Sequence, residues 1–246
     1  MARVKPNFEI RFEGQASRPK AGTAVVFDLE GFSGFYSQPD VQNYVTKYLN
    51  RVFECMSIIF RGDEQYWAEN ARTPALPTPL HRKFLGDGAL YVWETEPAFV
   101  ADAVRMDLLI NLWNLKKYFG RVVHAAADDV PVLDVPRNIR LGISQGTIYE
   151  LAYAGGGPKE YIGYAINLAS RLRDYCRELG FIASARIGLP EDKLLSHGFV
   201  KVIAKKLKGF PREIAIVDAN EYLALPPPIR AELFAEIAPV KPVRGV

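Results

Sequence analysis

The stretch Thr23-Ala-Val-Val-Phe-Asp28 is a short apolar run that ends in an acidic residue, and Gly31 follows it closely. A continuous apolar run of this length beside a turn residue is typical of a strand buried in a sheet. We therefore predict a buried strand at residues 23–28 and a tight turn after it. Such a strand would leave the Asp28 carboxylate at the edge of a sheet.

Three segments outside this strand show helical periodicity. Apolar residues recur at three- and four-residue steps from Gln38 to about Gly62, and Pro39 suits the first turn of that helix. A second helix is predicted from about Pro97 to Tyr118, and a third from about Gly163 to Leu179, where Gly180 would cap it. The apolar stripe of the second helix is predicted to consist of Phe99, Ala103, Met106, Ile110 and Trp113.

Strand patterns separate these helices. The segment Lys83–Trp93 holds two short strand patterns around Gly86-Asp87-Gly88, which is a hairpin signal. Residues 138–144 alternate apolar and polar as a half-buried strand does, and Tyr149–Tyr153 is predicted to be its hairpin partner. Further strands are predicted at residues 181–187, 199–204 and 213–217. The segments 63–81 and 121–136 show no clear period and are predicted to be irregular.

This order of elements predicts an α/β (α+β) fold, in which helices flank a central, mostly antiparallel sheet. At 246 residues the chain fits one sizeable domain. We place that domain at residues 22–218, with an N-terminal extension at 1–21 and an inserted arm at 63–81. The remaining residues, 219–246, contain Pro226-Pro227-Pro228 and are predicted to be peripheral after Leu223.

Composition excludes several classes of protein. A net charge of +3, from 31 basic and 28 acidic residues, does not predict a protein that coats nucleic acid. Two cysteines, Cys55 and Cys176, lack the spacing of a zinc site or a disulfide framework, so buried free thiols are expected. No secretory signal or run of about 18 apolar residues occurs, and a cytoplasmic protein without a membrane span is expected.

Two acids next to glycine carry the first hint of chemistry. Asp28 precedes the Gly31 turn, and Asp87 lies between Gly86 and Gly88 at a hairpin tip. Each acid alone is explained by turn chemistry. If the hairpin returns beside the first strand, however, both carboxylates would converge on a pair of metal ions about 4 Å apart.

Two weaker patterns lie farther along the chain. Asn167 and Arg171 are four residues apart on a predicted helix, so both side chains can address one anion. Lys208 precedes Gly209 in a turn between two strands, where a lysine can contact phosphate. Asn167 and Arg171 are equally consistent with an ordinary solvated helix face, and a surface lysine is the default interpretation of Lys208.

Three segments together resemble the signature segments of class III adenylate and guanylate cyclases. They are Val25-Val-Phe-Asp28-Leu-Glu-Gly-Phe-Ser33, Lys83-Phe-Leu-Gly-Asp87-Gly88 and Glu160-Tyr-Ile-Gly-Tyr-Ala-Ile-Asn167-Leu-Ala-Ser-Arg171-Leu. The resemblance runs from about Gly22 to Val217, with insertions near 63–81 and 121–136. It implies a ferredoxin-like cyclase fold and a head-to-tail homodimer that holds its active sites at the interface.

The resemblance also implies a role for each matching residue. Asp28 and Asp87 of one protomer would hold two Mg²⁺ or Mn²⁺ ions, with help from the Leu29 carbonyl. Asn167 and Arg171 of the other protomer would orient the ribose and stabilise the transition state. The groups expected to bind the triphosphate are the backbone N–H groups of Gly31, Phe32 and Ser33 and the side chain of Lys208. The expected reaction converts a nucleoside triphosphate to a 3′,5′-cyclic nucleotide and pyrophosphate.

Lys83 and Glu160 occupy the two positions that select the base in this family. Adenylate cyclases typically pair lysine with aspartate or threonine, whereas guanylate cyclases often pair glutamate with cysteine, so this chain departs from both patterns. Glutamate reaches about one methylene farther than aspartate, which would suit a smaller base. A Glu160 that faces solvent or simply pairs with Lys83 is the alternative.

As a compact cyclase without a predicted sensor domain, the chain looks like the pyrimidine cyclases of bacterial anti-phage defence (Pycsar type). Such an enzyme makes cUMP or cCMP for a separate effector protein, and UTP is slightly favoured here. The alternatives are an adenylate cyclase and an inactive, cyclase-like nucleotide-binding scaffold. An RNA-binding module would need exposed aromatic strands and a basic face, which the sequence does not indicate. His81, His124 and His197 are expected to be structural.

Overall fold

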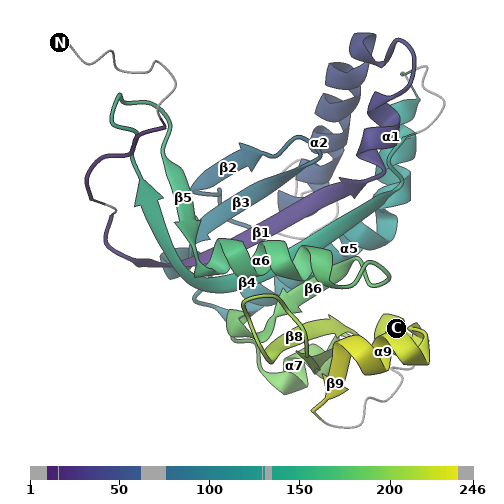
Figure 1. Ribbon diagram of the computed structural model, residues 1–246. Helices are drawn as coiled ribbons and strands as arrows, with labels where there is room; N and C mark the ends of the chain where they lie inside the picture. The colour runs from purple at the N-terminus through teal and green to yellow at the C-terminus, as the bar shows by residue number, and fades with distance from the viewer. Residues whose placement is uncertain (1–9, 16, 62–75, 129, 131–134, 238–246) are drawn as a thin grey trace.

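The computed structural model describes residues 10–15, 17–61, 76–128, 130 and 135–237 (Figure 1). Strand β1 (Lys20–Glu30) lies between β3 (Gly88–Glu94) and β4 (Asn138–Leu151) and is antiparallel to both. Its residues 22–29 are buried, because neighbouring strands and helices cover both faces. The buried strand predicted from the apolar run is confirmed.

The sheet is mixed and largely antiparallel. Its strands follow the order β2-β3-β1-β4-β6-β8-β7-β9, and β5 pairs with the far end of β4. Within the described residues, the pairing of β4 with β6 is the parallel one. The strands not yet given bounds are β2 (His81–Phe84), β5 (Glu160–Gly163), β6 (Phe181–Ser184), β7 (Phe199–Ala204), β8 (Glu213–Asp218) and β9 (Phe234–Glu236). The predicted architecture, a mostly antiparallel sheet flanked by helices, is confirmed.

Helices cover the two faces of the sheet unequally. Helices α2 (Val45–Arg61) and α5 (Asp102–Ala127) pack over one face, in the cluster that contains Val25 and Phe27. Helix α6 (Tyr164–Tyr175) covers the other face and packs on Val26 (Figure 1). The shorter helices are α1 (Phe32–Tyr36), η1 (Val41–Asn43), α4 (Thr95–Ala98), η2 (Ala185–Ile187), α7 (Glu191–Ser196), α8 (Ala219–Ala224) and α9 (Pro227–Leu233).

Helix α6 lies unusually close to β4. A Cβ atom at Gly142 of β4 would lie 1.9 Å from the carbonyl oxygen of Ala169 and 2.6 Å from the backbone nitrogen of Arg173. A Cβ atom at Gly146 would lie 2.8 Å from the Tyr164 ring. Because both glycines lack a side chain, the helix backbone packs almost directly on the strand backbone.

The predicted helices are present, but their ends differ from the prediction. The first begins at Val45, because Asp40 adopts a left-handed conformation (φ 61°) and a short 3₁₀ turn intervenes, so Pro39 is not in its first turn. The second runs from Asp102 to Ala127, so residues 121–127 are helical rather than irregular. Helix α6 ends at Tyr175, and Gly180 is not its cap.

The predicted stripe of the second helix was correct only in part: Phe99 and Met106 are buried as predicted, but the other three positions lie out of phase with the buried face. Ala103 is exposed, while Ile110 and Trp113 are only partly buried. The prediction took its phase from Phe99, which lies before the helix begins. The fully buried side chains of the helix are Met106, Leu108, Leu109, Leu112, Leu115, Phe119, Val122, Val123 and Ala126.

Two strand predictions also needed correction. Strand β4 continues without a turn to Leu151, so Tyr149 lies on the same strand as Asn138, and the true hairpin partner is β5. Strand β6 ends at Ser184, whose hydroxyl accepts a hydrogen bond from the Arg186 backbone and caps a 3₁₀ turn. The hairpin of β2 and β3 around Asp87 and the strands β7 and β8 are confirmed.

The segment after Leu223 is not peripheral as far as residue 237. Helix α9 leads into β9, which pairs with β7, and Phe234 is buried against Tyr222 of α8. Residues 238–246 and most of the predicted arm, residues 62–75, lie outside the described residues.

None of the helices described combines the length and apolar character that a bilayer crossing requires. Both cysteines are free, with Cys176 buried and Cys55 partly buried. Burial raises the pKa of the Cys176 thiol to about 11, so it remains protonated at neutral pH.

Candidate functional site

The sheet brings the two predicted acids together, and we call them the acid pair (Asp28 and Asp87). Asp28 is 5% exposed and lies opposite Gly88 in the ladder between β1 and β3. The Leu29 N–H donates a 2.7 Å hydrogen bond to the Asp87 carbonyl, which holds the hairpin tip against the end of β1. A Cβ atom at Gly88 would lie 1.9 Å from the Phe27 carbonyl oxygen, so only glycine permits this close approach.

Burial and the proximity of the two carboxylates raise the pKa of Asp87. Burial raises the pKa of Asp87, and the hydrogen bond and negative charge of Asp28 raise it further. Two adjacent carboxylates favour a cation between them, and their oxygens are the ligands that Mg²⁺ and Mn²⁺ prefer. Within the described residues, no cluster of three or more His, Cys, Asp or Glu side chains is arranged to hold a metal ion. The acid pair therefore fits a metal whose remaining ligands come from substrate and water.

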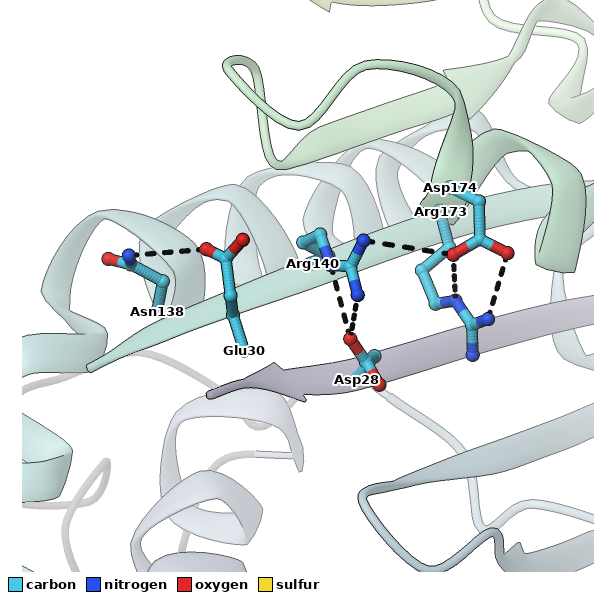
Figure 2. A network of polar contacts seen from close by, with 6 residues as sticks. All are labelled: Asp28, Glu30, Asn138, Arg140, Arg173 and Asp174. Carbon is cyan, nitrogen blue, oxygen red and sulfur yellow. Dashed lines mark hydrogen bonds and ion pairs between the residues drawn. The ribbon is translucent and has the colours of Figure 1, made fainter. Parts of the chain in front are cut away.

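Two arginines, which the sequence analysis missed, flank the acid pair. Arg140 is the β4 residue opposite Asp28, and its Nε and Nη2 atoms both donate to Asp28 Oδ2, the first at 3.1 Å. Its Nη1 atom lies 3.9 Å from Asp174 of α6, and Figure 2 shows Arg140 between the two acids. Arg173 donates to both carboxylate oxygens of Asp174, at 3.0 and 2.9 Å.

We call these five residues, Asp28, Asp87, Arg140, Arg173 and Asp174, the acid network. Burial opposes the charged form of Arg173, but the hydrogen bonds and charge of Asp174 and the charges of Asp28 and Asp87 raise its pKa. One sequence signal was available for Arg140. It shares one face of the strand with Gly142 and Gly146, where a partly buried arginine favours an acidic partner.

The predicted phosphate-binding turn follows the acid pair directly. Gly31 adopts a left-handed conformation (φ 86°) at the start of α1, and its carbonyl accepts hydrogen bonds from Gly34 and Phe35. The N–H groups of Phe32 and Ser33 precede the first hydrogen bonds within the helix, as the opening N–H groups of helices do. Because the Phe32 side chain is buried, the backbone that carries these N–H groups is fixed in place.

Asn167 and Arg171 are not brought to the acid pair of their own chain. Both are exposed on α6, and neither side chain has a hydrogen-bond or ion-pair partner in the part of the chain that the structure describes. The α6 face that points to the acid pair carries Arg173, and Arg171 lies about 200° away around the helix.

Lys208 is likewise separated from the acid pair. It is exposed in the turn between β7 and β8, where Gly209 has a φ of 80°. Strand β8 is three positions from β1 in the sheet order, a separation of about 14 Å between strands. One copy of the chain therefore presents the predicted site residues in separate groups.

Lys83 and Glu160, the base-recognition pair, contact each other. Lys83 Nζ lies 2.7 Å from Glu160 Oε1 and 2.8 Å from Oε2. The Tyr153 hydroxyl donates to Oε1 at 3.2 Å, a contact that the sequence analysis did not predict. The hydrogen bond from Lys83 lowers the pKa of Glu160, and that from Tyr153 adds to the effect. The predicted alternative of a Glu160 that pairs with Lys83 is thus what this structure shows.

The sequence matches no protein-family model and has no significant match among curated proteins. Solved structures do resemble it. The adenylyl cyclase CyaB from P. aeruginosa superposes with a TM-score of 0.58 at 19% identity, covering 82% of this chain and 94% of that one. A bacterial light-regulated adenylyl cyclase gives 0.56 at 17% identity, covering 87% and 97% respectively.

The guanylyl cyclase Cya2 superposes with a TM-score of 0.56 at 15% identity, covering 83% of this chain and 93% of that one. At identities below 25%, these superpositions establish a shared fold and nothing further. The chain has the architecture seen in these adenylyl and guanylyl cyclases, a largely antiparallel sheet flanked by helices.

Proposed function

We propose that this protein is a nucleotidyl cyclase that converts a nucleoside triphosphate to a 3′,5′-cyclic nucleotide and pyrophosphate. The observation that carries the proposal is the convergence of Asp28 and Asp87 at the end of β1, directly before the Gly31 turn. The fold shared with adenylyl and guanylyl cyclases supports it. An acid pair followed by the opening backbone N–H groups of a helix suits a metal-bound triphosphate.

In this proposal the chain's own residues bind, orient and neutralise the substrate. Asp28, Asp87 and the Leu29 carbonyl would hold two Mg²⁺ or Mn²⁺ ions. The chemistry that these ions supply is a lower pKa for the ribose 3′-hydroxyl and neutralisation of the departing pyrophosphate. Phe32 and Ser33 would offer N–H groups to the phosphate oxygens. Once the metal ions bind Asp28, Arg140 would be left beside the triphosphate as an additional cationic group.

A homodimer would complete the site. Arg171 points away from the acid pair of its own chain, although its planar donor group suits the charge that grows on the phosphoryl oxygens. In a two-fold dimer the same surface is used twice, so Asn167, Arg171 and Lys208 of one protomer can serve the acid pair of its partner. We propose that the sites form in this way at the dimer interface.

The base-recognition pair offers a donor and an acceptor side by side. Lys83 has three N–H groups and directs two contacts at Glu160, so one donor remains. The Glu160 carboxylate keeps acceptor capacity beyond its contacts with Lys83 and Tyr153. An adjacent donor and acceptor complement the edge of any of the four bases. We propose a pyrimidine, UTP before CTP, because the longer reach of glutamate suits a smaller ring, and we expect a separate effector protein to respond to the product.

Incubation of the purified protein with each of the four triphosphates and Mn²⁺, followed by mass spectrometry, tests both levels of the proposal. Cyclic UMP or CMP as the main product would support the pyrimidine preference, whereas cyclic AMP would replace it with an adenylate cyclase. The Asp87→Ala variant should give no product while keeping the oligomeric state of the wild type. If the wild type binds triphosphates but makes no cyclic product, the protein is a nucleotide-binding scaffold and the cyclase proposal is wrong.

Mixing two inactive variants tests the shared site. Asp87→Ala and Arg171→Ala should each be inactive alone, since each lacks one half of every site. A mixed dimer would contain one site with both residues intact, so an equal mixture should recover about a quarter of wild-type activity. An inactive mixture of dimers that exchange subunits would show that each chain builds its site alone.

A further inference from the structure

We infer that Tyr153, held in place by Phe12 of the N-terminal segment, positions Glu160 and thereby sets how selectively the protein binds its base. Tyr153 is a positioning residue in this inference, because it contacts Glu160 rather than the substrate. The inference rests on the proposed function, since it assigns a device that serves the base-recognition pair.

Glu160 needs such support because it lies at a weak point of the sheet. The ladder between β4 and β5 runs from Ile148–Gly163 to Leu151–Glu160, so Glu160 occupies its last pair. Beyond that pair the chain turns through Gly155, Gly156 and Gly157, and two of these have positive φ values, 77° and 122°. Terminal pairs of a ladder fray, and glycine-rich turns restrain them little.

The N-terminal segment, by which we mean the described residues 10–15 and 17–19, restrains this end of the hairpin. Its backbone runs antiparallel to residues 150–154, and Figure 1 shows the segment beside the hairpin of β4 and β5. The Glu13 N–H donates to the Ala152 carbonyl at 2.8 Å, and the Ala154 N–H donates to the Arg11 carbonyl at 2.9 Å. These two bonds bracket the bridge between Phe12 and Tyr153.

Side chains continue the connection from the segment to the base-recognition pair. The Phe12 ring lies 5.0 Å from the Tyr153 ring, centroid to centroid, with the ring planes tilted by 32°. The Tyr153 hydroxyl then donates to Glu160 Oε1, the oxygen that also lies 2.7 Å from Lys83. Phe12, Tyr153, Glu160 and Lys83 thus form an unbroken series of contacts.

The tyrosine hydroxyl restricts Glu160 in two ways. It occupies one lone-pair position of Oε1. It also adds a contact from a second residue to a carboxylate that Lys83 alone would allow to rotate. With the hydroxyl present, the remaining acceptor position has a fixed direction and favours one arrangement of base N–H groups. Without the hydroxyl, the Glu160 carboxylate can rotate to accept hydrogen bonds from different bases, so discrimination between the bases should fall.

Tyr153→Phe and Phe12→Ala test the inference, each with a matched control. The controls are Tyr149→Phe, whose hydroxyl has no partner in the described part of the chain, and Ile10→Ala, whose side chain is 79% exposed. For Tyr153→Phe we expect KM for the preferred triphosphate to rise about 3- to 10-fold with kcat nearly unchanged. The ratio of kcat/KM between the best and second-best triphosphates should fall by a similar factor.

Phe12→Ala should act in the same direction with a smaller effect. Combined with Tyr153→Phe it should add nothing, because both changes interrupt one series of contacts. A Tm equal to that of the wild type in thermal scans would show that the effects do not come from unfolding. Wild-type selectivity and KM in both single variants would overturn the inference while leaving the cyclase proposal intact.

A binding experiment distinguishes failure of the cyclase proposal from failure of the inference about Tyr153. If the wild type makes no product, the same variants are compared by calorimetric binding of each triphosphate with Mn²⁺. Reduced discrimination in Tyr153→Phe relative to Tyr149→Phe would still support the inference for a binding protein. Equal discrimination, or no binding by the wild type, would overturn it.

Discussion

The acid network and the base-recognition pair each contain an acid that is paired with a cation, but their surroundings differ. In each, an acid proposed to face substrate is already neutralised by a cation of its own chain, Asp28 by Arg140 and Glu160 by Lys83. The first pair lies on central strands, with side chains 7% and 15% exposed, whereas Lys83 is 44% exposed and Glu160 ends a ladder. In our proposal, the interactions that the chemistry requires lie where the backbone is fixed, and those that select the base lie where the backbone can adjust unless Tyr153 restrains it.

The largest expected effect comes from removing the negative charge of Asp28 in the acid network. Asp28→Asn should reduce cyclic nucleotide formation by about 10³-fold or more, because an amide cannot hold the metal ions or balance Arg140. Glu30→Gln is the matched control, since Glu30 lies two residues away on the same strand and contacts Asn138. Product quantification by mass spectrometry checks both. Residual activity within tenfold of the wild type would exclude Asp28 as a metal ligand.

Arg140→Gln should separate metal binding from turnover. The change removes the cation that competes for Asp28, so Mn²⁺ affinity without nucleotide should rise, while turnover should fall about 10- to 100-fold because a phosphate donor is lost. Calorimetric titration with Mn²⁺ measures the first effect and steady-state kinetics the second. Arg121→Gln, on the exposed surface of α5, should change neither. Unchanged Mn²⁺ affinity in Arg140→Gln would show that this arginine does not compete with metal.

In the base-recognition pair, Lys83→Met should act mainly on substrate binding. We expect KM to rise about tenfold and the preference among bases to fall, with a smaller change in kcat. The ion pair is partly exposed, so its loss should cost less than about 1 kcal/mol of stability. Kinetics with all four triphosphates and a thermal scan check these points. A loss of kcat at unchanged KM would place Lys83 in the chemical step instead.

The smallest expected effect concerns the metal-free protein. Because folding raises the pKa of Asp87, its favourable contribution is present at low pH and is lost as the pH rises through that pKa. Asp87→Asn should therefore raise the Tm at pH 7, by less than about 2 °C because the Asp87 carboxyl is only partly desolvated. The difference in Tm between the variant and the wild type should narrow as the pH falls. Mn²⁺ should then stabilise the wild type and not the variant. A variant less stable than the wild type at pH 7 would contradict this sign.

Local patterns predicted the elements that local physics determines. The apolar run before Asp28 and the glycines around Asp87 predicted a buried strand and a hairpin, and both acids meet as proposed. The long-range partners were not predictable in this way. Arg140 is 112 residues from Asp28 in sequence, and only the register between β1 and β4 brings them together. The same holds for Tyr153, whose contact with Glu160 depends on a hairpin that the sequence analysis placed incorrectly.

Gly142 has a consequence for how activity can be controlled. The backbones of α6 and β4 are in close contact at this residue. We therefore expect the strand that carries Arg140 and the helix that carries Asn167 and Arg171 to move as one rigid body. A signal therefore has little freedom to move the backbone at these three residues relative to one another within one subunit. In the proposed dimer, we expect it to rotate one subunit against the other, so that Arg171 of one subunit moves toward or away from Asp28 and Asp87 of its partner.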